Sequence, residues 1–280
     1  MNTGIIGAGK VGCSLGKYFV LHGLSVSGFF DVSPELAKTA AQFAQTRYTD
    51  NLETLVKESD ALFLTVPDGL ITQVWNQVRE YPIEGKYICH CSGALSAGEA
   101  FPGIKDRGAF GYSIHPLFAV SDRFQSWKEL SHAYFTIEGD EEHLEEVRAQ
   151  FASFGNPVRI IRPEDKVKYH CAAAICSNQV IALIEESLCL MEQCGFEKDS
   201  GLQALSPLIE GNVKKVLGNG TEQSLTGPVE RGDVKTIQKH MEVLGEEDRL
   251  LYRLLSKKLE TIARKKNPDR DYEALRRILQ

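Results

Sequence analysis

A glycine-rich loop near the N-terminus has the spacing of a dinucleotide-binding turn. Gly7, Gly9 and Gly12 form the pattern Gly-x-Gly-x-x-Gly, directly after a short apolar run and before a run with helical spacing. In such a loop the first glycine permits a tight turn, the second lets a pyrophosphate approach the backbone, and the third lets the helix pack against the strand. The start of the helix offers unpaired N–H groups and a positive dipole end to phosphates. The loop residues expected to contact the cofactor are Gly7, Ala8, Gly9, Lys10, Val11 and Gly12.

The same segment also begins like a P-loop, with Gly4 followed by Gly9 and Lys10 at the right spacing. In a P-loop the next residue is Ser or Thr, whose hydroxyl holds Mg²⁺, whereas this chain has Val11. Gly4 also lies inside the expected first strand. These two departures argue against a nucleotide hydrolase.

An acidic residue ends the second apolar strand, at the position that contacts the cofactor's ribose. Asp31 follows the glycine loop by about 20 residues, where a carboxylate accepts hydrogen bonds from a ribose 2′-hydroxyl and repels a 2′-phosphate. No Lys or Arg stands between Asp31 and Lys38 to attract that phosphate. We therefore expect NAD(H), with NADP(H) as the alternative. If Asp31 only caps the turn at Ser33, the preference is open.

Polar residues follow two further predicted strands and mark a third segment. Asp68 follows the run 61–66, Ser92 follows the run 87–91, and His115 is expected in a loop. Ligands of doubly wound sheets bind beyond the carboxyl ends of the strands. We therefore expect cofactor contacts at Val66, Pro67, Asp68 and Ser92, and we expect Ser92 and His115 to orient the substrate for catalysis.

Helical spacing places the reactive side chains of the segment that begins at Asp165 on one face. Lys166, His170, Ala173 and Ser177 share this face. Two protonated groups at positions 166 and 170 would lower each other's pKa, and a lowered pKa suits a proton donor that works near neutral pH. The alternative is that Lys166 lies in a solvated first turn and that His170 is a core histidine.

The elements that must position these residues alternate between strands and helices. Apolar runs predict strands at 3–6, 25–30, 61–66, 87–91, 133–138 and 158–161, with intervening helices that include 36–45 and 141–154. After Pro163 the strand-like runs disappear, and helical patterns cover 165–195, 206–217 and 234–264. The expected fold class is α/β, with a Rossmann-type doubly wound parallel sheet in residues 1–162 and an all-α C-terminal domain in residues 163–280.

Composition excludes several classes of protein. The chain has 280 residues, which suggests about two domains, and a net charge of −6, which lacks the basic character of a nucleic-acid partner. No apolar run approaches the ~18 residues of a membrane span, and no secretory signal is visible at the N-terminus. The seven cysteines are an odd number and indicate reduced thiols. We expect a cytoplasmic protein that binds neither nucleic acid nor membrane.

The sequence Cys89-His90-Cys91 could suggest a metal site. In a strand the two cysteines share one face while His90 points to the other, so the three side chains cannot converge. The chain also has no Cys-x-x-Cys pair to anchor zinc. No bound metal is expected.

Four segments together resemble a known family. HCSGALSA, SIHPLF, DKVKYHCAAAICSN and LTGPVERGD are similar to segments of a bacterial family of oxidoreductases that pairs a Rossmann-like domain with a helical domain of unknown function. That family lies within the superfamily of 6-phosphogluconate and 3-hydroxyisobutyrate dehydrogenases. The resemblance implies hydride transfer between a nicotinamide cofactor and a small carbonyl compound or hydroxy acid at an inter-domain cleft. It also implies a homodimer formed through the helical domain.

The resemblance assigns roles to individual positions. Ser92-Gly93 matches a Ser-Gly pair that contacts substrate in the hydroxyacid dehydrogenases, and Lys166 matches their catalytic lysine. Their helix carries Asn four positions after that lysine, whereas this chain has His170, so their substrates are not carried over. Further substrate contacts are expected at Asn178, Thr226 and Arg231, with Arg231 holding a carboxylate in a bidentate pair. The alternative for the segment around Arg231 is a helix stop followed by an Asp cap.

Two other functions use the same residues. A non-catalytic sensor of NAD(P) redox state would need the glycine loop but neither Lys166 nor His170. An imine reductase similar to pyrroline-5-carboxylate reductase would keep the cofactor and change the substrate class.

Overall fold

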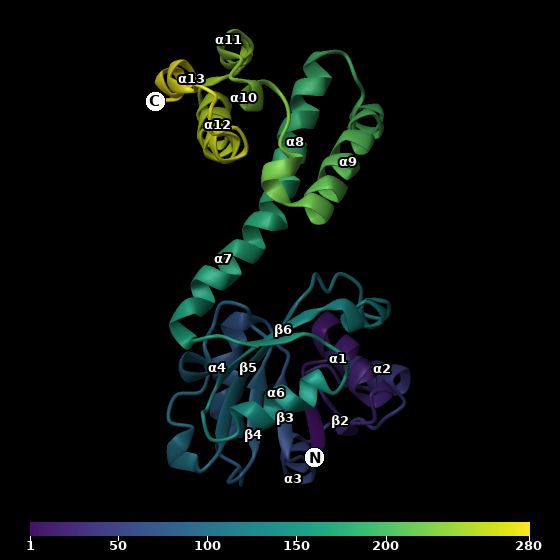
Figure 1. The fold of residues 1–280 in the computed structure, drawn as a ribbon. Coiled ribbons are helices and arrows are strands. Elements are labelled where there is room, and N and C mark those ends of the chain that lie inside the picture. The colour runs from purple at the N-terminus through teal and green to yellow at the C-terminus, as the bar shows by residue number, and fades with distance from the viewer. The chain divides into compact units, whose positions relative to one another are not determined.

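The computed structural model describes all 280 residues, which form two compact units, Met1–Ile181 and Ala182–Gln280 (Figure 1). The sequence predicts a division after residue 162, where the chain passes from its last strand into helices. The first unit extends further because Lys166, the first residue of the next helix, is buried and donates to the Ser92 carbonyl oxygen just after a strand.

A seven-stranded sheet organises the first unit, as the predicted Rossmann-type α/β fold requires. Its strands are β1 (Asn2–Ile6), β2 (Ser25–Phe30), β3 (Ala61–Leu64), β4 (Tyr87–His90), β5 (Phe110–Leu117), β6 (Tyr134–Gly139) and β7 (Val158–Ile160), in the order β2-β1-β3-β4-β5-β6-β7. β1 to β5 run parallel, whereas β6 pairs antiparallel with β5 and parallel with β7. The carboxyl ends of β1 to β5 therefore share one edge of the sheet.

Helices bury both faces of this sheet. The unit contains α1 (Lys10–Leu21), α2 (Pro34–Ala44), α3 (Leu52–Glu58), α4 (Asp68–Val78), α5 (Ala97–Ala100), α6 (Leu144–Ala152), α7 (Lys166–Cys176) and the short 3₁₀ turns η1 (Lys105–Arg107), η2 (Ser126–Lys128), η3 (Leu130–His132) and η4 (Pro163–Asp165). Ile5 joins one apolar core with Phe19 and Phe151, while the next residue, Ile6, joins a second core with Trp75. Successive strand residues point to opposite faces, so the two cores lie on opposite sides of the sheet. All four residues of β3 are buried, as expected for a strand covered on both faces.

The sequence prediction missed β5 and placed His115 in a loop, which was wrong. His115 lies inside β5, opposite Thr136 of β6. Gly111 and Pro116 weaken the strand pattern of this segment, because both residue types are unfavourable in strand interiors. Pairing with β4 on one side and β6 on the other forms the strand despite this local preference.

Helices alone build the second unit, after a break in the helical segment that leads into it. The predicted helix 165–195 is divided at Ser177, whose φ is −117° and ψ is −77°, into α7 and α8 (Asn178–Gln193). The remaining helices are α9 (Lys198–Ser224), α10 (Pro228–Arg231), α11 (Val234–Val243), α12 (Glu246–Lys266) and α13 (Glu273–Leu279). A separate small core joins Val229, Ile237 and Ala263 with Tyr272 and Leu275.

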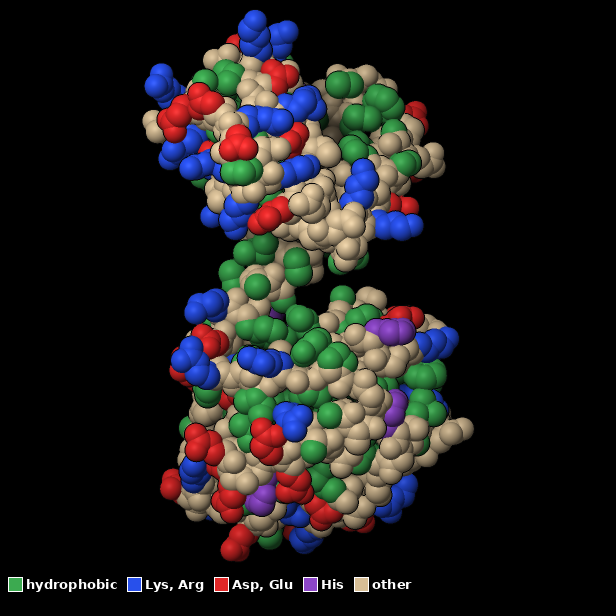
Figure 2. Space-filling model, viewed as in Figure 1, with side chains coloured by type: hydrophobic (Ala, Val, Ile, Leu, Met, Phe, Trp, Pro, Cys, Tyr) green, Lys and Arg blue, Asp and Glu red, His purple; other side chains and the backbone are tan.

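The helical segment Pro163–Gln193 is long and apolar enough to cross a membrane, by length and composition. The expectation that no apolar run approaches this length was therefore wrong. Core helices of other proteins pass the same test, so length and composition assign no membrane location. Little of the segment is buried. Within the second unit, Figure 2 shows further exposed apolar side chains over α8 and α9, where Leu208 is 61% and Leu217 is 83% exposed.

Candidate active site

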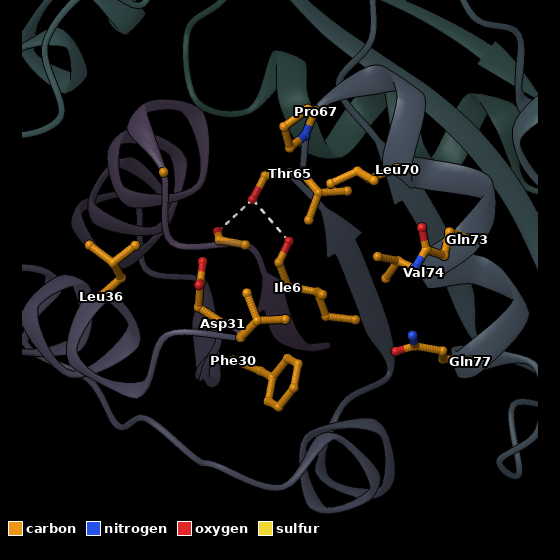
Figure 3. Close-up of a pocket in the computed structure, with 14 residues that line it drawn as sticks. Ile6, Phe30, Asp31, Leu36, Thr65, Pro67, Leu70, Gln73, Val74 and Gln77 are labelled. Atoms are coloured by element: carbon orange, nitrogen blue, oxygen red, sulfur yellow. Dashed lines mark hydrogen bonds between the residues drawn. The ribbon is translucent and has the colours of Figure 1, made fainter.

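A pocket lies over the carboxyl ends of β1, β2 and β3, beside the glycine loop (Figure 3). Asp31 and Leu36 line one side, and residues of α4 line the other. The lining residues are Ile6, Gly7, Gly9, Phe30, Asp31, Val32, Leu36, Thr65, Val66, Pro67, Leu70, Gln73, Val74 and Gln77. Asp31 is the single charged residue in this lining, so the pocket is apolar except at one carboxylate and a few polar groups.

The three glycines of the loop meet three different steric demands. Gly7 has a φ of +101°, a region that favours glycine. A Cβ on Gly12 would lie 2.0 Å from the Gly7 carbonyl oxygen, so only glycine lets α1 approach the loop this closely. A Cβ on Gly9 would meet nothing within 4 Å. The position of Gly9 therefore leaves open space above the backbone, next to the pocket.

Helix α1 presents its free N-terminus at this open space. Gly9 is the N-cap residue, no side chain caps the helix, and no acidic residue stands in the first turn. The Thr65 hydroxyl donates to the Gly7 carbonyl oxygen over 2.7 Å and holds the loop (Figure 3). Unpaired N–H groups at the positive end of a helix dipole suit a pyrophosphate. Lys10 and Val11, also expected as cofactor contacts, lie in the first turn of α1 but do not line the pocket.

Asp31 fastens the loop and the following turn while it lines the pocket. One carboxylate oxygen accepts from the Ala8 N–H over 2.7 Å, and the other accepts from the Ser33 N–H over 2.9 Å. Two oxygens offer about four acceptor positions, so this carboxylate retains capacity for ribose hydroxyls. Asp31 therefore caps the turn at Ser33, which was the alternative, and it also lines the pocket. The loop, the helix start and Asp31 fit a nicotinamide dinucleotide.

Ser92 links this pocket to a second group of polar residues. Its hydroxyl lies 2.6 Å from an Asp68 carboxylate oxygen, directly beyond Pro67 of the pocket lining. The same hydroxyl oxygen accepts from the N–H groups of Ala94 and Leu95 at 3.2 and 3.0 Å. Because a hydroxyl has one hydrogen, Ser92 donates it to Asp68 and shapes the turn after β4.

Lys166 lies beneath that turn and is only 1% exposed. Its Nζ donates to the Ser92 carbonyl oxygen over 2.9 Å and to the Ser113 hydroxyl, and it lies 3.9 Å from a Glu138 carboxylate oxygen. Ser113 and Glu138 are paired across β5 and β6, on the same face as His115. Neither Ser113 nor Glu138 was predicted from the sequence. The alternation Ser113-x-His115 would have revealed the first of them had β5 been recognised.

Burial shifts the pKa values of Lys166 and Glu138 in opposite directions, each towards the uncharged form. Loss of hydration lowers the pKa of Lys166 to about 8, against the opposing influence of the Glu138 carboxylate. Burial likewise raises the pKa of Glu138, one of whose oxygens accepts from the Ala97 N–H while the other has no partner. The pKa of Lys166 is therefore lowered as expected, but by burial and not by His170.

Two imidazoles meet over Gly93, just beyond the Ser92 turn. A Cβ on Gly93 would lie 2.4 Å from Cδ2 of His170 and 2.9 Å from Nε2 of His115. His170 is exposed, whereas His115 is partly buried, and burial lowers the pKa of His115 to about 4. The hydroxyl of Tyr169, which the sequence analysis also missed, lies 2.8 Å from Nδ1 of His115. The fold thus brings Ser92, Gly93, His115, Lys166 and His170 together.

Three further residues were predicted as substrate contacts. Asn178 is exposed at the start of α8, beyond the helix break. Thr226 and Arg231 belong to the second unit, where Gly232 ends α10 and Asp233 caps α11 by accepting from the Thr236 N–H. This is the helix stop and Asp cap considered as the alternative. The substrate roles of these three residues stay predictions.

The cysteines of β4 take no part in a ligand cluster. His90 is buried against Phe101 and accepts from the Ser92 N–H, and burial lowers its pKa to about 3. All seven cysteines are unpaired thiols. No group of three or more His, Cys, Asp or Glu side chains is placed to hold a metal ion.

Sequence comparison identifies two domains in the chain. Residues 1–116 match the Rossmann-like domain family, and residues 133–259 match the family described as a domain of unknown function, DUF2520. The chain therefore joins a Rossmann-like domain to a DUF2520 domain, which confirms the domain pair implied by the resemblance. No curated protein shows significant sequence similarity to it.

Several solved structures share the fold over nearly the whole chain. Protein TM1727 from Thermotoga maritima is 26% identical, with a TM-score of 0.76 over 94% of this chain and 98% of its own. Pyrroline carboxylate reductase from Plasmodium falciparum, solved with NADP bound, is 14% identical, with a TM-score of 0.59 over 94% and 98%. An imine reductase from Myxococcus stipitatus, solved in complex with NADP⁺, is 17% identical, with a TM-score of 0.63 over 100% of both chains. These similarities confirm the fold class.

Proposed function

We propose that this protein is an NAD(H)-dependent oxidoreductase that interconverts a small carbonyl compound and its alcohol. The observation that carries the proposal is the hydrogen bond between Ser92 and Asp68, because Asp68 directly follows Pro67 of the pocket lining and Ser92 directly precedes Gly93 of the polar cluster. Both features lie at the carboxyl edge of one sheet, where doubly wound folds bind their ligands. The two reductases with the same fold support a nicotinamide-dependent reduction, whereas the carbonyl substrate is proposed from this chain's own residues.

The chain's own residues divide the work of such a reaction. A bound nicotinamide dinucleotide supplies or accepts the hydride. Lys166 holds the Ser92 carbonyl oxygen and Ser113 from below and has almost no exposure, so it positions the turn. His170 faces the space over Gly93 and is open to solvent, so it donates the proton to the substrate oxygen or removes it.

The pocket favours NAD(H) over NADP(H) in this proposal. Asp31 is its single charged lining residue, and a carboxylate at the ribose repels a 2′-phosphate. No lysine or arginine lines the pocket to offset that repulsion. Two of the structural neighbours were solved with NADP. The proposed preference for NAD(H) therefore rests on Asp31 of this chain and not on the neighbours.

A substrate panel followed by NADH absorbance tests the reaction. Ketones, aldehydes, keto acids and cyclic imines are offered with NADH, and hydroxy acids with NAD⁺. We expect turnover on carbonyl or hydroxy compounds, with a kcat about 10²-fold lower in His170→Gln, the usual range for loss of a general acid. His240→Gln, which changes an exposed histidine of the second unit, is the matched control and retains wild-type rates.

The alternatives give different results in the same assay. Turnover confined to cyclic imines would favour an imine reductase. Tight NADH binding without turnover on any compound would favour the redox sensor and would contradict the enzymatic proposal.

We also propose that two copies associate through their helical units, in the cytoplasm and without nucleic acid or membrane. Helix α9 supports this, because Val213, Val216 and Leu217 share one helical face and are all at least 40% exposed although they are apolar. Contiguous exposed apolar surface of this kind commonly marks an interface. Sedimentation should give a dimer for the wild type, whereas Val213→Glu with Leu217→Glu, both on that face, should give a monomer. A wild-type monomer would contradict the proposal.

A further inference from the structure

Tyr169 and His115 form a polar pair between α7 and β5. The Tyr169 hydroxyl oxygen lies 2.8 Å from Nδ1 of His115, and the two rings are nearly perpendicular, at 84°. Both residues lie next to proposed site residues, yet no step described above uses Tyr169. The contact is therefore a feature that the proposed reaction leaves unexplained.

The direction of this hydrogen bond follows from the partners available to each group. In a neutral imidazole one ring nitrogen donates and the other accepts. The other partner of the Tyr169 hydroxyl is Thr136, which lies opposite His115 on β6 and lowers the pKa of the phenol as a donor to its oxygen. The hydrogen of Tyr169 therefore goes to Nδ1 of His115. The proton of the imidazole then resides on Nε2.

Burial keeps both groups in their uncharged forms. The pKa of His115 is lowered to about 4, first by burial and then by the charges of Lys166 and His170. Burial also raises the pKa of Tyr169. Near neutral pH the imidazole is therefore neutral and the phenol retains its hydrogen.

The protonated nitrogen faces the space that Gly93 leaves open. A Cβ at Gly93 would lie only 2.9 Å from Nε2, so the nitrogen borders the space that such a side chain would fill. No group of the chain forms a hydrogen bond with Nε2. His170 borders the same space from the neighbouring helix face.

We propose that Tyr169 is a positioning residue that fixes His115 as its Nε2–H form, so that neutral His115 donates a hydrogen bond to the substrate oxygen above Gly93. This inference rests on the proposed function and specifies its substrate class. A neutral N–H donor needs a lone pair, which the oxygen of an aldehyde or ketone offers and a protonated imine nitrogen lacks. His115 polarises the C=O bond and keeps its own proton, while the oxygen takes the proton from His170.

The tautomer is measurable directly, without cofactor or substrate. Two-bond ¹H–¹⁵N NMR of the labelled protein near pH 7 identifies which nitrogen is protonated in each histidine ring, and His115→Gln assigns the signals of His115. We expect the Nε2–H form in the wild type and a shift towards the Nδ1–H form in Tyr169→Phe. The same variant should lower kcat on the best carbonyl substrate about 10-fold or more and leave the Kd for NADH unchanged.

The chain contains a matched control for this variant. Tyr252 and His240 make the same contact, also 2.8 Å between the hydroxyl oxygen and Nδ1, in the second unit. Tyr252→Phe should leave both the His115 signals and kcat unchanged. The proposal is overturned if wild-type His115 carries its proton on Nδ1, or if Tyr169→Phe leaves its tautomer unaltered. Failure of the whole substrate panel would instead refute the proposed function, because the NMR result does not depend on turnover.

Discussion

The two halves of the candidate site are built by opposite means. The cofactor pocket depends mainly on backbone: a glycine loop, the free start of α1 and one carboxylate that accepts from two N–H groups. The cluster at Gly93 depends on side chains from β5, β6 and α7 around the turn that follows β4. A backbone-built site tolerates most side-chain changes but fails where a Cβ would clash. A side-chain-built site should lose chemistry without losing the fold.

Gly12→Ala should produce the largest effect on the backbone-built half. Its Cβ would lie 2.0 Å from the Gly7 carbonyl oxygen and 2.4 Å from the Thr65 hydroxyl oxygen, so the loop and α1 must separate. Overpacking of this kind typically costs about 3 kcal/mol at the upper end, and NADH binding should be lost with it. Urea unfolding and NADH titration measure both effects. Wild-type stability in this variant would show that the loop is not closely packed.

Lys166→Met should reveal how strongly burial disfavours the charge in the side-chain-built half. The folded pKa of about 8 lies below the ordinary value of 10.5, so the unfolded chain binds more protons between these pH values. Wild-type stability contributed by this group therefore increases as pH rises from about 8 to 10.5, by about 3 kcal/mol. The variant lacks this increase.

The measurement is the difference between the unfolding free energies of wild type and variant, followed through that pH range. Other titrating groups are common to both chains and cancel. Lys168→Met is the control, because Lys168 lies two residues away and is exposed in an ion pair with Asp165. A difference that stays flat with pH for Lys166→Met would contradict the assigned burial of its charge.

Gly93→Ala should separate chemistry from folding. The new Cβ would displace His170, an exposed side chain that can move, and would crowd Nε2 of His115. We expect a change in stability below about 1 kcal/mol and a kcat at least ~10-fold lower. Gly98→Ala, where a Cβ meets nothing within 4 Å, should leave kcat unchanged and raise stability by up to about 1 kcal/mol, because Gly98 lies in helix α5. Full activity in Gly93→Ala would place the substrate elsewhere.

Asp31→Asn should give the smallest effect. The amide retains one acceptor oxygen, so it can satisfy only one of the two N–H groups of Ala8 and Ser33. We expect NADH affinity about 10-fold lower and a smaller preference over NADPH, because the repulsion of a 2′-phosphate disappears. Calorimetric titration with both cofactors checks this. An unchanged ratio of the two affinities would show that Asp31 does not select the cofactor.

The contrast between the backbone-built pocket and the side-chain-built cluster also explains which parts of the site could be predicted from the sequence. The glycine loop and Asp31 are recognisable because their chemistry depends on neighbours close in the chain. Lys166 and His170 could be placed on one face by helical spacing, but the burial of Lys166 depends on Ser113 and Glu138, which only the register of β5 and β6 brings together. Tyr169 escaped notice because its importance comes from His115, whose strand has no clear local signal.

The most direct test of the central claim is calorimetric titration of NADH into the wild type and Gly9→Ala, with thermal unfolding measured on both proteins. A Cβ on Gly9 meets no protein atom within 4 Å, so the variant should fold, and it should lose no more than about 1 kcal/mol because alanine is a poorer N-cap than glycine. That Cβ would occupy the approach of the pyrophosphate, so we expect one NADH site per chain in the wild type and at least ~10-fold weaker binding in the variant. Equal affinity in the two proteins, or no NADH binding by the wild type, would contradict the assignment of this pocket to the cofactor.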